Sequence, residues 1–305
     1  MLGIGRGDRV LLPEFICADV LAPLAAAGAT PVWYAVDHTL APAGDPTQWP
    51  AARAVLAVNY FGVAQDLAPF DAYAARCGAT VVEDNAHGYL SRDSNGRWLG
   101  CRSRLGIFSF RKSANTLNAA ALLANDAALS VRLAAQLPPG ASPLRAGSGL
   151  KHFLRRLPLA GPPLAGIATA AAQMLREKRT GSAVPLPAAD TESAIPGEPA
   201  PPPQIADALQ AFDADAEIRR RYQLYEIFLQ LAQRNGAQAV IATLPDGSVP
   251  YGFAFRGEAE AIRAMQQQAR RRGLDVFRWP ALPSTLAAAA APAHYRDVWL
   301  VNFLW

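Results

Sequence analysis

Short apolar runs alternate with helical segments over the first 137 residues of this 305-residue chain. The apolar runs lie at residues 9–13, 30–36, 54–59, 80–82, 105–110 and 119–123. Between them, residues 18–27 and 67–77 have helical composition, and each of these two segments stops at a glycine, which commonly ends a helix. Apolar strands that are separated by helices join in parallel, so the pattern predicts a mainly parallel sheet with helices on both faces.

The pattern changes twice toward the C-terminus. Proline and glycine are frequent in residues 138–203, which predicts a linker or an extended loop. The elements expected after it are a long helix at 204–235, strands at 239–243 and 249–255, a helix at 257–272, and strands at 274–277 and 298–303. We therefore expect a large α/β domain over residues 1–137, a variable connection over 138–203, and a small α+β domain over 204–305.

Composition supports a folded enzyme-sized core and argues against a nucleic-acid partner. Hydrophobic residues make up 51% of the chain and charged residues 18%. The net charge of +4 includes arginine clusters at residues 219–221 and 270–272, on helices that we expect to be amphipathic, where such charges form a solvated face. No aromatic residues interleave with these clusters, so nucleic-acid binding is not predicted.

Cysteine usage and the apolar segments indicate the compartment. Cys17, Cys77 and Cys101 form no CxxC pair, which is typical of a protein from the reducing cytoplasm. The N-terminus lacks the basic, apolar and cleavable regions of a signal peptide. The longest apolar stretch, residues 157–175, contains three prolines, so we expect no membrane span.

The first candidate for chemistry follows the strand expected at residues 80–82. Residues 83–87 read Glu-Asp-Asn-Ala-His, which places Asp84 at the end of a buried strand and His87 three residues later. Carboxylates at the C-terminal ends of parallel strands point into the crevice where α/β proteins bind ligands. Taken alone, the motif fits a capping aspartate and a surface histidine equally well. Asp84 and His87 have no third partner at metal-ligand spacing, so no metal site is predicted.

The second candidate follows the strand expected at residues 105–110. Apolar residues lead into Ser109 and then into the basic pair Arg111-Lys112. A lysine at the mouth of a sheet can be desolvated, which lowers its pKa and exposes the neutral amine that attacks an aldehyde. An isolated basic pair after a strand is more often simply solvated.

Together the two segments favour one cofactor. Pyridoxal 5'-phosphate (PLP) needs a lysine for an imine, a carboxylate beside its ring nitrogen, and hydroxyl or backbone N–H groups for its phosphate. Asp84 and Lys112 supply the first two groups in the order that fold-type-I PLP enzymes use.

Several motifs resemble the DegT/StrS type of sugar aminotransferase, from about residue 3 to residue 126 and again, weakly, from about residue 214. The similar segments are Gly-Asp-Arg-Val-Leu-Leu-Pro at 7–13, Gly-Ala-Thr-Pro-Val at 28–32, Asn-Tyr-Phe-Gly at 59–62, Glu-Asp-Asn-Ala-His at 83–87, Phe-Ser-Phe-Arg-Lys-Ser at 108–113, and residues 273–280. The resemblance implies a fold-type-I architecture and transfer of an amino group from a donor such as glutamate to a nucleotide-linked keto sugar. It also implies a homodimer and a place in polysaccharide or surface-glycan synthesis.

The resemblance assigns a role to each candidate residue. Asp84 would pair with the ring nitrogen of PLP, and His87 would contact the ring or its hydroxyl. Ser109 would contact the phosphate. Lys112 would hold the cofactor as a Schiff base and then carry a proton.

The chain also departs from the family pattern. The family's opening Ser-Gly-Thr turn, which grips the phosphate at a helix N-terminus, has no counterpart here. Cys17 replaces an aromatic residue, and Ala119-Ala120 replace a Gly-Gly pair. Two hypotheses follow: an active sugar aminotransferase whose opening segment is encoded upstream of the present start, or a degenerate member that serves as a non-catalytic partner or binding subunit.

Overall fold

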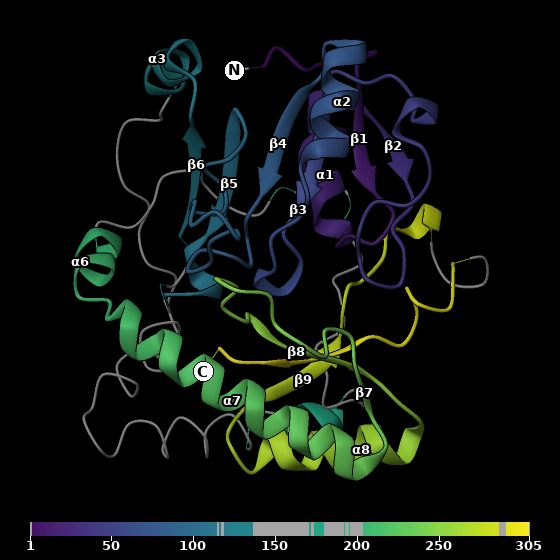
Figure 1. Ribbon diagram of the computed structural model, residues 1–305, viewed down its shortest axis with the longest axis vertical. Coiled ribbons are helices and arrows are strands. Elements are labelled where there is room, and N and C mark those ends of the chain that lie inside the picture. The colour runs from purple at the N-terminus through teal and green to yellow at the C-terminus, as the bar shows by residue number, and fades with distance from the viewer. Residues whose placement is uncertain are drawn as a thin grey trace.

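The larger sheet of the protein has six strands. The computed structural model describes residues 2–114, 116, 119–136, 171, 174–179, 192, 195, 204–286 and 291–304. In sheet order the strands are β2 (Thr30–Tyr34), β1 (Arg9–Pro13), β3 (Ala54–Val58), β4 (Thr80–Asp84), β5 (Leu105–Ser109) and β6 (Ala120–Ala124). The first five strands are parallel to one another and β6 runs antiparallel to β5, which confirms the predicted mainly parallel α/β sheet (Figure 1).

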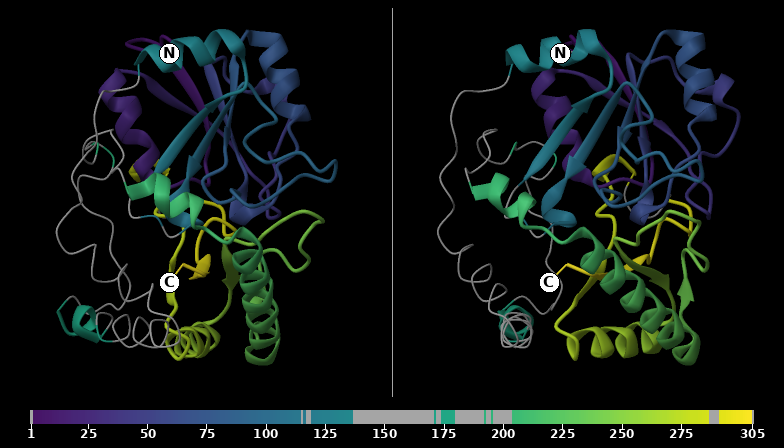
Figure 2. Two further views of the ribbon diagram at one scale, coloured as in Figure 1. Left: turned by 90° about the vertical axis from the view of Figure 1, so that its left-hand side faces the viewer. Right: turned by 60° about the vertical axis from the view of Figure 1, so that its left-hand side comes forward.

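Helices cover both faces of this sheet. The helix α1 (Leu21–Ala27) lies on one face and α2 (Ala68–Cys77) on the other, while α3 (Ala127–Gln136) lies at one end (Figure 2). Both α1 and α2 end at the predicted glycines, each in the left-handed conformation that closes a helix. All five residues of β3 are buried, as expected for a central strand covered on both sides.

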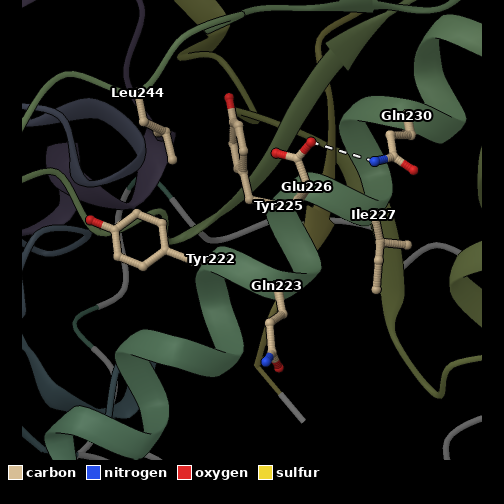
Figure 3. Close-up of a pocket in the computed structure, with 7 residues that line it drawn as sticks. All are labelled: Tyr222, Gln223, Tyr225, Glu226, Ile227, Gln230 and Leu244. Atoms are coloured by element: carbon tan, nitrogen blue, oxygen red, sulfur yellow. Dashed lines mark hydrogen bonds between the residues drawn. The ribbon is translucent and has the colours of Figure 1, made fainter.

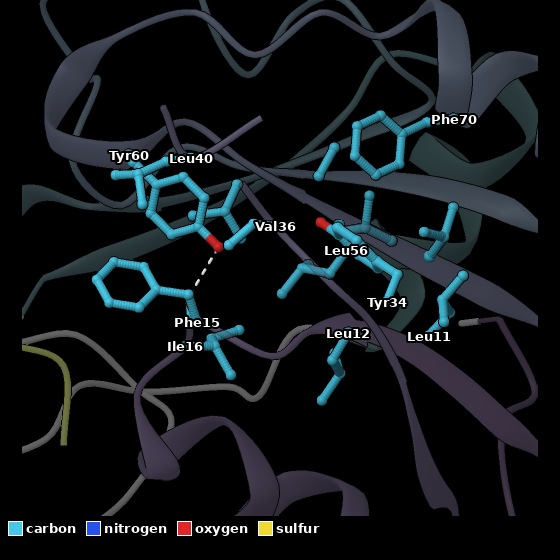
Figure 4. Packing of buried hydrophobic residues seen from close by; sticks show 14 of the residues in the cluster. Leu11, Leu12, Phe15, Ile16, Tyr34, Val36, Leu40, Leu56, Tyr60 and Phe70 are labelled. Carbon is cyan, nitrogen blue, oxygen red and sulfur yellow. Dashed lines mark hydrogen bonds between the residues drawn. The ribbon is translucent and has the colours of Figure 1, made fainter. Parts of the chain in front are cut away.

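The core under these helices is rich in aromatic residues. The ring of Tyr34 stacks on Trp49 with centroids 4.9 Å apart, and Phe70 from α2 meets Tyr34 edge-on at 5.6 Å. Toward the strand ends, the hydroxyl of Tyr60 donates a hydrogen bond to the carbonyl of Phe15 at 2.7 Å (Figure 4). This bond ties the turn after β3 to the turn after β1, two of the turns that surround the site.

The second sheet is antiparallel and smaller. Its order is β7 (Gln238–Ala239), β8 (Gly252–Arg256), β10 (Trp299–Asn302) and β9 (Asp275–Arg278). The helices α7 (Ala214–Asn235) and α8 (Ala259–Arg270) pack on one face of it (Figure 1). Because side chains alternate along a strand, Phe253 and Phe255 face these helices, while Ala254 packs into the core of the larger sheet.

Two details differ from the predicted elements. The helix expected at 204–235 is divided into α6 (Gln204–Gln210) and α7, because the carboxylate of Asp213 accepts a hydrogen bond from the Ala216 N–H at 2.9 Å and starts a new helix. The strand expected at 239–243 is reduced to β7, which ends at Ala239. The hydroxyl of Tyr225 donates a hydrogen bond to the carbonyl of Ile241, so this carbonyl is not available for pairing in a longer strand.

The predicted connection at 138–203 falls almost wholly outside the described residues, so the division into three parts stays a prediction. Most of the apolar stretch at 157–175 also lies outside them. Among the described residues, no helix has both the length and the hydropathy that crossing a bilayer requires.

Candidate functional site

Two neighbouring strands deliver the candidate residues to one edge of the larger sheet. Strand β4 ends at Asp84, and the turn that follows carries His87. Strand β5 lies beside β4 and ends at Ser109, and the short 3-10 helix at Phe110–Lys112 carries Lys112. Because parallel strands end at the same edge, residues that lie about 25 positions apart in sequence meet there.

His87 and Lys112 are in contact. The Lys112 Nζ lies 3.2 Å from the His87 Nε2, within hydrogen-bond distance. On the other side of the imidazole, the backbone N–H of Phe61 donates to His87 Nδ1 at 3.3 Å. His87 is only 5% exposed, so the prediction of a surface histidine, left open by the sequence, is wrong.

Aromatic rings from both sheets enclose His87. Its ring stacks on Tyr251, just before β8, with centroids 4.1 Å apart and planes 7° apart. Phe61 stacks at 5.9 Å, and Trp279 lies at 5.1 Å with a tilt of 56°. The small sheet therefore forms part of the wall around the imidazole.

The backbone at Phe61 is strained in order to make these contacts. Phe61 has a φ of 54°, an uncommon conformation for a bulky residue. In this conformation its N–H faces His87, and its carbonyl accepts the Tyr251 N–H at 2.9 Å. The next residue, Gly62, has a φ of 92°, and a Cβ there would lie 2.1 Å from the carbonyl oxygen of Val249. Close packing against the small sheet thus requires glycine.

Asp84 and Lys112 are close enough for each to influence the pKa of the other, but their side chains do not touch. Desolvation lowers the pKa of Lys112 and raises the pKa of Asp84, in each case against the attraction of the other group. Within the described part of the chain, no ion pair shorter than 4 Å joins them, and the Asp84 carboxylate accepts one hydrogen bond, from the Ala86 N–H at 2.9 Å. Cys17 belongs to the same electrostatic neighbourhood, and burial raises the pKa of its thiol to about 11.

Two hydroxyl groups that follow Lys112 in the sequence lack partners among the residues that the structure describes. Ser109, at the end of β5, makes no side-chain hydrogen bond to Asp84, His87 or Lys112 in the described residues. Ser113 Oγ and Thr116 Oγ1 are buried without any hydrogen-bond partner there. An unsatisfied buried hydroxyl costs about 1–3 kcal/mol, so these groups are suited to a ligand that accepts hydrogen bonds.

A buried arginine of α7 secures the lysine loop. Arg221 is 1% exposed, and its guanidinium donates to the carbonyl of Lys112 at 3.1 Å and to the Glu217 carboxylate at 2.7 Å. The expectation that residues 219–221 form a solvated face is therefore wrong for Arg221. The acid four residues earlier, Glu217, was the sequence signal that could have identified a paired arginine.

The acid next to Asp84 has a different environment. Glu83 is fully buried and accepts hydrogen bonds from Arg102 at 2.6 Å and from Asn59 at 2.9 Å. Asn85 joins this network by accepting from Asn59 and donating to the Leu99 carbonyl, which accounts for an asparagine at this position. A Cβ on Gly88 would lie 2.2 Å from Asn85 Oδ1, so glycine is required there.

A groove of about 620 Å³ lies elsewhere, along α7 (Figure 3). It is lined by Tyr222, Gln223, Tyr225, Glu226, Ile227, Gln230 and Leu244. None of the candidate site residues lines it, so its size does not bear on their chemistry. Within the described residues, no group of three or more histidine, cysteine or acidic side chains is placed to hold a metal ion.

The structure thus places Lys112 and His87 in contact, brings Asp84 within electrostatic reach of Lys112, and leaves Ser109 without a bond to the other three. Sequence reasoning missed Phe61, Tyr251 and Arg221. The backbone N–H of Phe61 carries no sequence signal, and Tyr251 reaches the site only through the packing of the two sheets.

Comparison with known proteins agrees with this architecture. Residues 1–141 match the model of the DegT/DnrJ/EryC1/StrS aminotransferase family. Among solved structures, a DegT DnrJ EryC1 StrS aminotransferase from Brucella abortus superposes with a TM-score of 0.63 at 17% sequence identity, covering 98% of this chain and 75% of that one.

Two further solved structures have the same fold. DesV of S. venezuelae, solved in complex with a ketimine intermediate, gives a TM-score of 0.60 at 22% identity, covering 100% of this chain and 76% of its own. The E coli GDP-4-keto-6-deoxy-D-mannose-3-dehydratase with bound hydrated PLP gives 0.59 at 15% identity, covering 98% and 76%. Identities this low establish the fold, and the predicted fold-type-I architecture is confirmed.

Proposed function

We propose that this chain is a PLP-dependent aminotransferase that acts on a nucleotide-linked keto sugar, since residues 1–141 match the model of the DegT/DnrJ/EryC1/StrS aminotransferase family. The amino donor is a small amino acid such as glutamate, and the aminated sugar serves polysaccharide or surface-glycan synthesis. The working form is a homodimer in the cytoplasm.

The residues present at the strand ends fit PLP. The cofactor combines an aldehyde, a ring nitrogen, a ring hydroxyl and a phosphate. Against these, the site offers a desolvated amine, a desolvated carboxylate that does not neutralise it, an imidazole, and buried hydroxyls without partners. The amine, the carboxylate and the hydroxyls are costly to bury in their present state, and each would gain a partner when such a ligand binds.

Each residue then has a task. When bound, PLP supplies a reactive aldehyde on an electron-accepting ring. Lys112 Nζ would hold the aldehyde end and would be the base that moves a proton. Asp84 would keep a proton on the ring nitrogen, and His87 would contact the ring or its hydroxyl. Ser109 would bind the phosphate, together with the unpartnered hydroxyls of Ser113 and Thr116.

The ring stack around His87 shields the imidazole that contacts the lysine. Tyr251 precedes β8 and Trp279 follows β9 of the small sheet, and Phe61 lies in the turn after β3 of the large one. Their rings leave the imidazole 5% exposed, which preserves the desolvation that keeps the Lys112 amine nucleophilic.

Two features of similar proteins support the substrate class. The E coli structure of the same fold has bound hydrated PLP, and its name gives a GDP-linked keto sugar as its substrate. The matched family is a family of aminotransferases. The observation that carries the proposal is the Lys112 amine, which lies 3.2 Å from His87 in the short helix that follows β5, the strand next to that of Asp84.

The test is a half-reaction. The purified protein is loaded with PLP and mixed with glutamate, and the formation of 2-oxoglutarate and pyridoxamine phosphate is measured in equal amounts. Addition of a nucleotide-linked keto sugar should then return the cofactor to PLP and yield an amino sugar with the mass expected for exchange of oxygen for NH₂ plus hydrogen. A protein that remains colourless with PLP and gives neither product is the non-catalytic partner of the second hypothesis.

A further inference from the structure

The two hydrogen bonds at the His87 imidazole define where its proton lies. A backbone N–H can only donate, so His87 Nδ1, which receives the Phe61 N–H at 3.3 Å, must act as an acceptor. A neutral imidazole carries one proton, which therefore sits on Nε2. The doubly protonated ring is excluded by the same contact, because it would place two N–H groups against each other.

The Nε2 proton in turn defines the state of the lysine. Lys112 Nζ lies 3.2 Å from His87 Nε2, and an ammonium group has three N–H donors and no acceptor. Only the unprotonated amine has a lone pair that can receive the Nε2 proton. We infer that Phe61 holds His87 as the neutral tautomer with its proton on Nε2, and that His87 in this form donates to an unprotonated Lys112 amine before any cofactor binds. His87 is then a positioning residue for the amine.

The surroundings favour the same arrangement. Burial lowers the pKa of His87 well below its usual value, and the positive charges of the nearby Arg221 and Arg111 lower it further. Burial also lowers the pKa of Lys112. The charged or titratable groups that face the pair are Cys17 and Asp19 after β1, Asp84 on β4, Arg111 next to the lysine, Arg221 on α7 and Tyr251 before β8.

The inference also predicts that glutamine can take the place of His87. A glutamine amide has one acceptor oxygen and a donor NH₂ group, so it can accept the Phe61 N–H and donate to Lys112 as the imidazole does. The inference depends on the proposed function only for the use of the amine, since the proton arrangement can be measured without PLP.

The direct test is nitrogen NMR of the histidines in protein free of PLP. The chain has four histidines, and the spectrum of His87→Gln identifies the signals of His87. We expect a neutral imidazole protonated on Nε2 between pH 6 and 8. A signal from the Nδ1-protonated tautomer, or from the doubly protonated ring at pH 7, would overturn the inference.

The second readout is the labelling of Lys112 by a limiting amount of acetic anhydride over a pH series. The chain contains three lysines, Lys112, Lys151 and Lys178, and the exposed Lys178 serves as an internal reference in peptide mass spectra. We expect the Lys112 midpoint to lie below pH 7, far under the ordinary lysine value of about 10.4, so that the amine is already unprotonated at neutral pH. His87→Gln should keep this midpoint, whereas His87→Leu should raise it by roughly one unit, about a tenfold loss of free amine.

His38→Leu is the matched control, because His38 is exposed and its loss should leave the midpoint unchanged. An equal midpoint in His87→Leu and the wild type, or an equal shift in both His87 variants, contradicts the inference. If His87→Leu does not fold, the NMR result on the wild type still decides. A protein that passes both tests and ignores PLP would refute the proposed function and leave the inference standing.

Discussion

Glu83 and Asp84 are adjacent acids at the end of one strand, but the carboxylate of Glu83 has an ion-pair partner and that of Asp84 has none in the described residues. Glu83 is fully buried, and every hydrogen bond around it is made, with Arg102 bound at 2.6 Å and Asn59 at 2.9 Å. Asp84 faces a lysine that it does not touch, and desolvation raises its pKa. Successive residues of a strand point to opposite faces, so the backbone separates a structural acid from a chemical one. A charge whose partners are complete supports the fold, whereas a desolvated charge without them is available to a ligand.

The largest expected effect comes from Lys112→Ala. Loss of the amine should lower transaminase activity by at least about 10³-fold, because only a primary amine can form an imine with the aldehyde of PLP. Stability should change by no more than about 1 kcal/mol, since the charged amine is disfavoured by its surroundings. Initial rates of 2-oxoglutarate formation and urea unfolding measure the two quantities. Residual activity within tenfold of the wild type would refute the assignment.

Glu83→Gln should show the opposite profile. Removing this charge leaves the Arg102 guanidinium in the interior with Asp93, 3.9 Å away, as its nearest remaining acid. Breaking a buried pair in this way costs about 3–5 kcal/mol in the free energy of unfolding. Urea unfolding measures this loss. The matched control is Asp71→Asn on the exposed face of α2, which should cost less than about 1 kcal/mol. An equal loss of unfolding free energy in both variants would show that the hydrogen bonds and ion pair of Glu83 stabilise the fold no more than an exposed acid does.

The pH dependence of the free energy of unfolding should reveal the lowered pKa of His87. Its pKa is lowered in the folded state, so the unfolded chain binds a proton more readily below pH 6.5. Stability attributable to His87 is therefore complete above that pH and is lost as the pH falls, by about 1.4 kcal/mol for each pH unit until the folded-state pKa is reached. Unfolding of the wild type and of His87→Gln from pH 7.5 to 5 tests this. As the pH falls, the free energy of unfolding should decrease less in the variant than in the wild type. Parallel curves of unfolding free energy against pH would contradict the account.

Asp84→Asn should have the smallest effect on the free energy of unfolding, in contrast to Glu83→Gln. Asp84→Asn keeps an oxygen for the Ala86 N–H and removes a carboxylate whose charge is disfavoured, because its pKa is raised in the folded state. Ionised Asp84 thus destabilises the fold above its unfolded pKa, so the variant should be more stable at pH 7, by less than about 1 kcal/mol. Cofactor affinity should fall at the same time. Urea unfolding and a PLP titration measure the two effects, and a loss of stability like that of Glu83→Gln would remove the distinction between the acids.

Local pattern was sufficient for the strands and for the place of three candidate residues in the fold, while their roles stay predictions. The apolar runs predicted β1 through β6, and the strand ends predicted that Asp84, His87 and Lys112 would share an edge. The separation of Glu83 from Asp84 was not predicted, because both are acids and the decisive partner, Arg102, is set by the loop between β4 and β5. Tyr251 and Arg221 were missed because they reach the site through the packing of the two sheets, which no local pattern encodes.

The most direct test of the central claim, that Lys112 is the amine built to hold PLP, is borohydride reduction of the PLP-loaded protein followed by peptide mass analysis. Reduction fixes the cofactor to whichever amine carries it, and the chain offers only three lysines and its N-terminus. We predict that a visible absorption band disappears on reduction and that the added mass lies on the peptide containing Lys112. The added mass on Lys151 or Lys178, or on no peptide at all, would contradict the account.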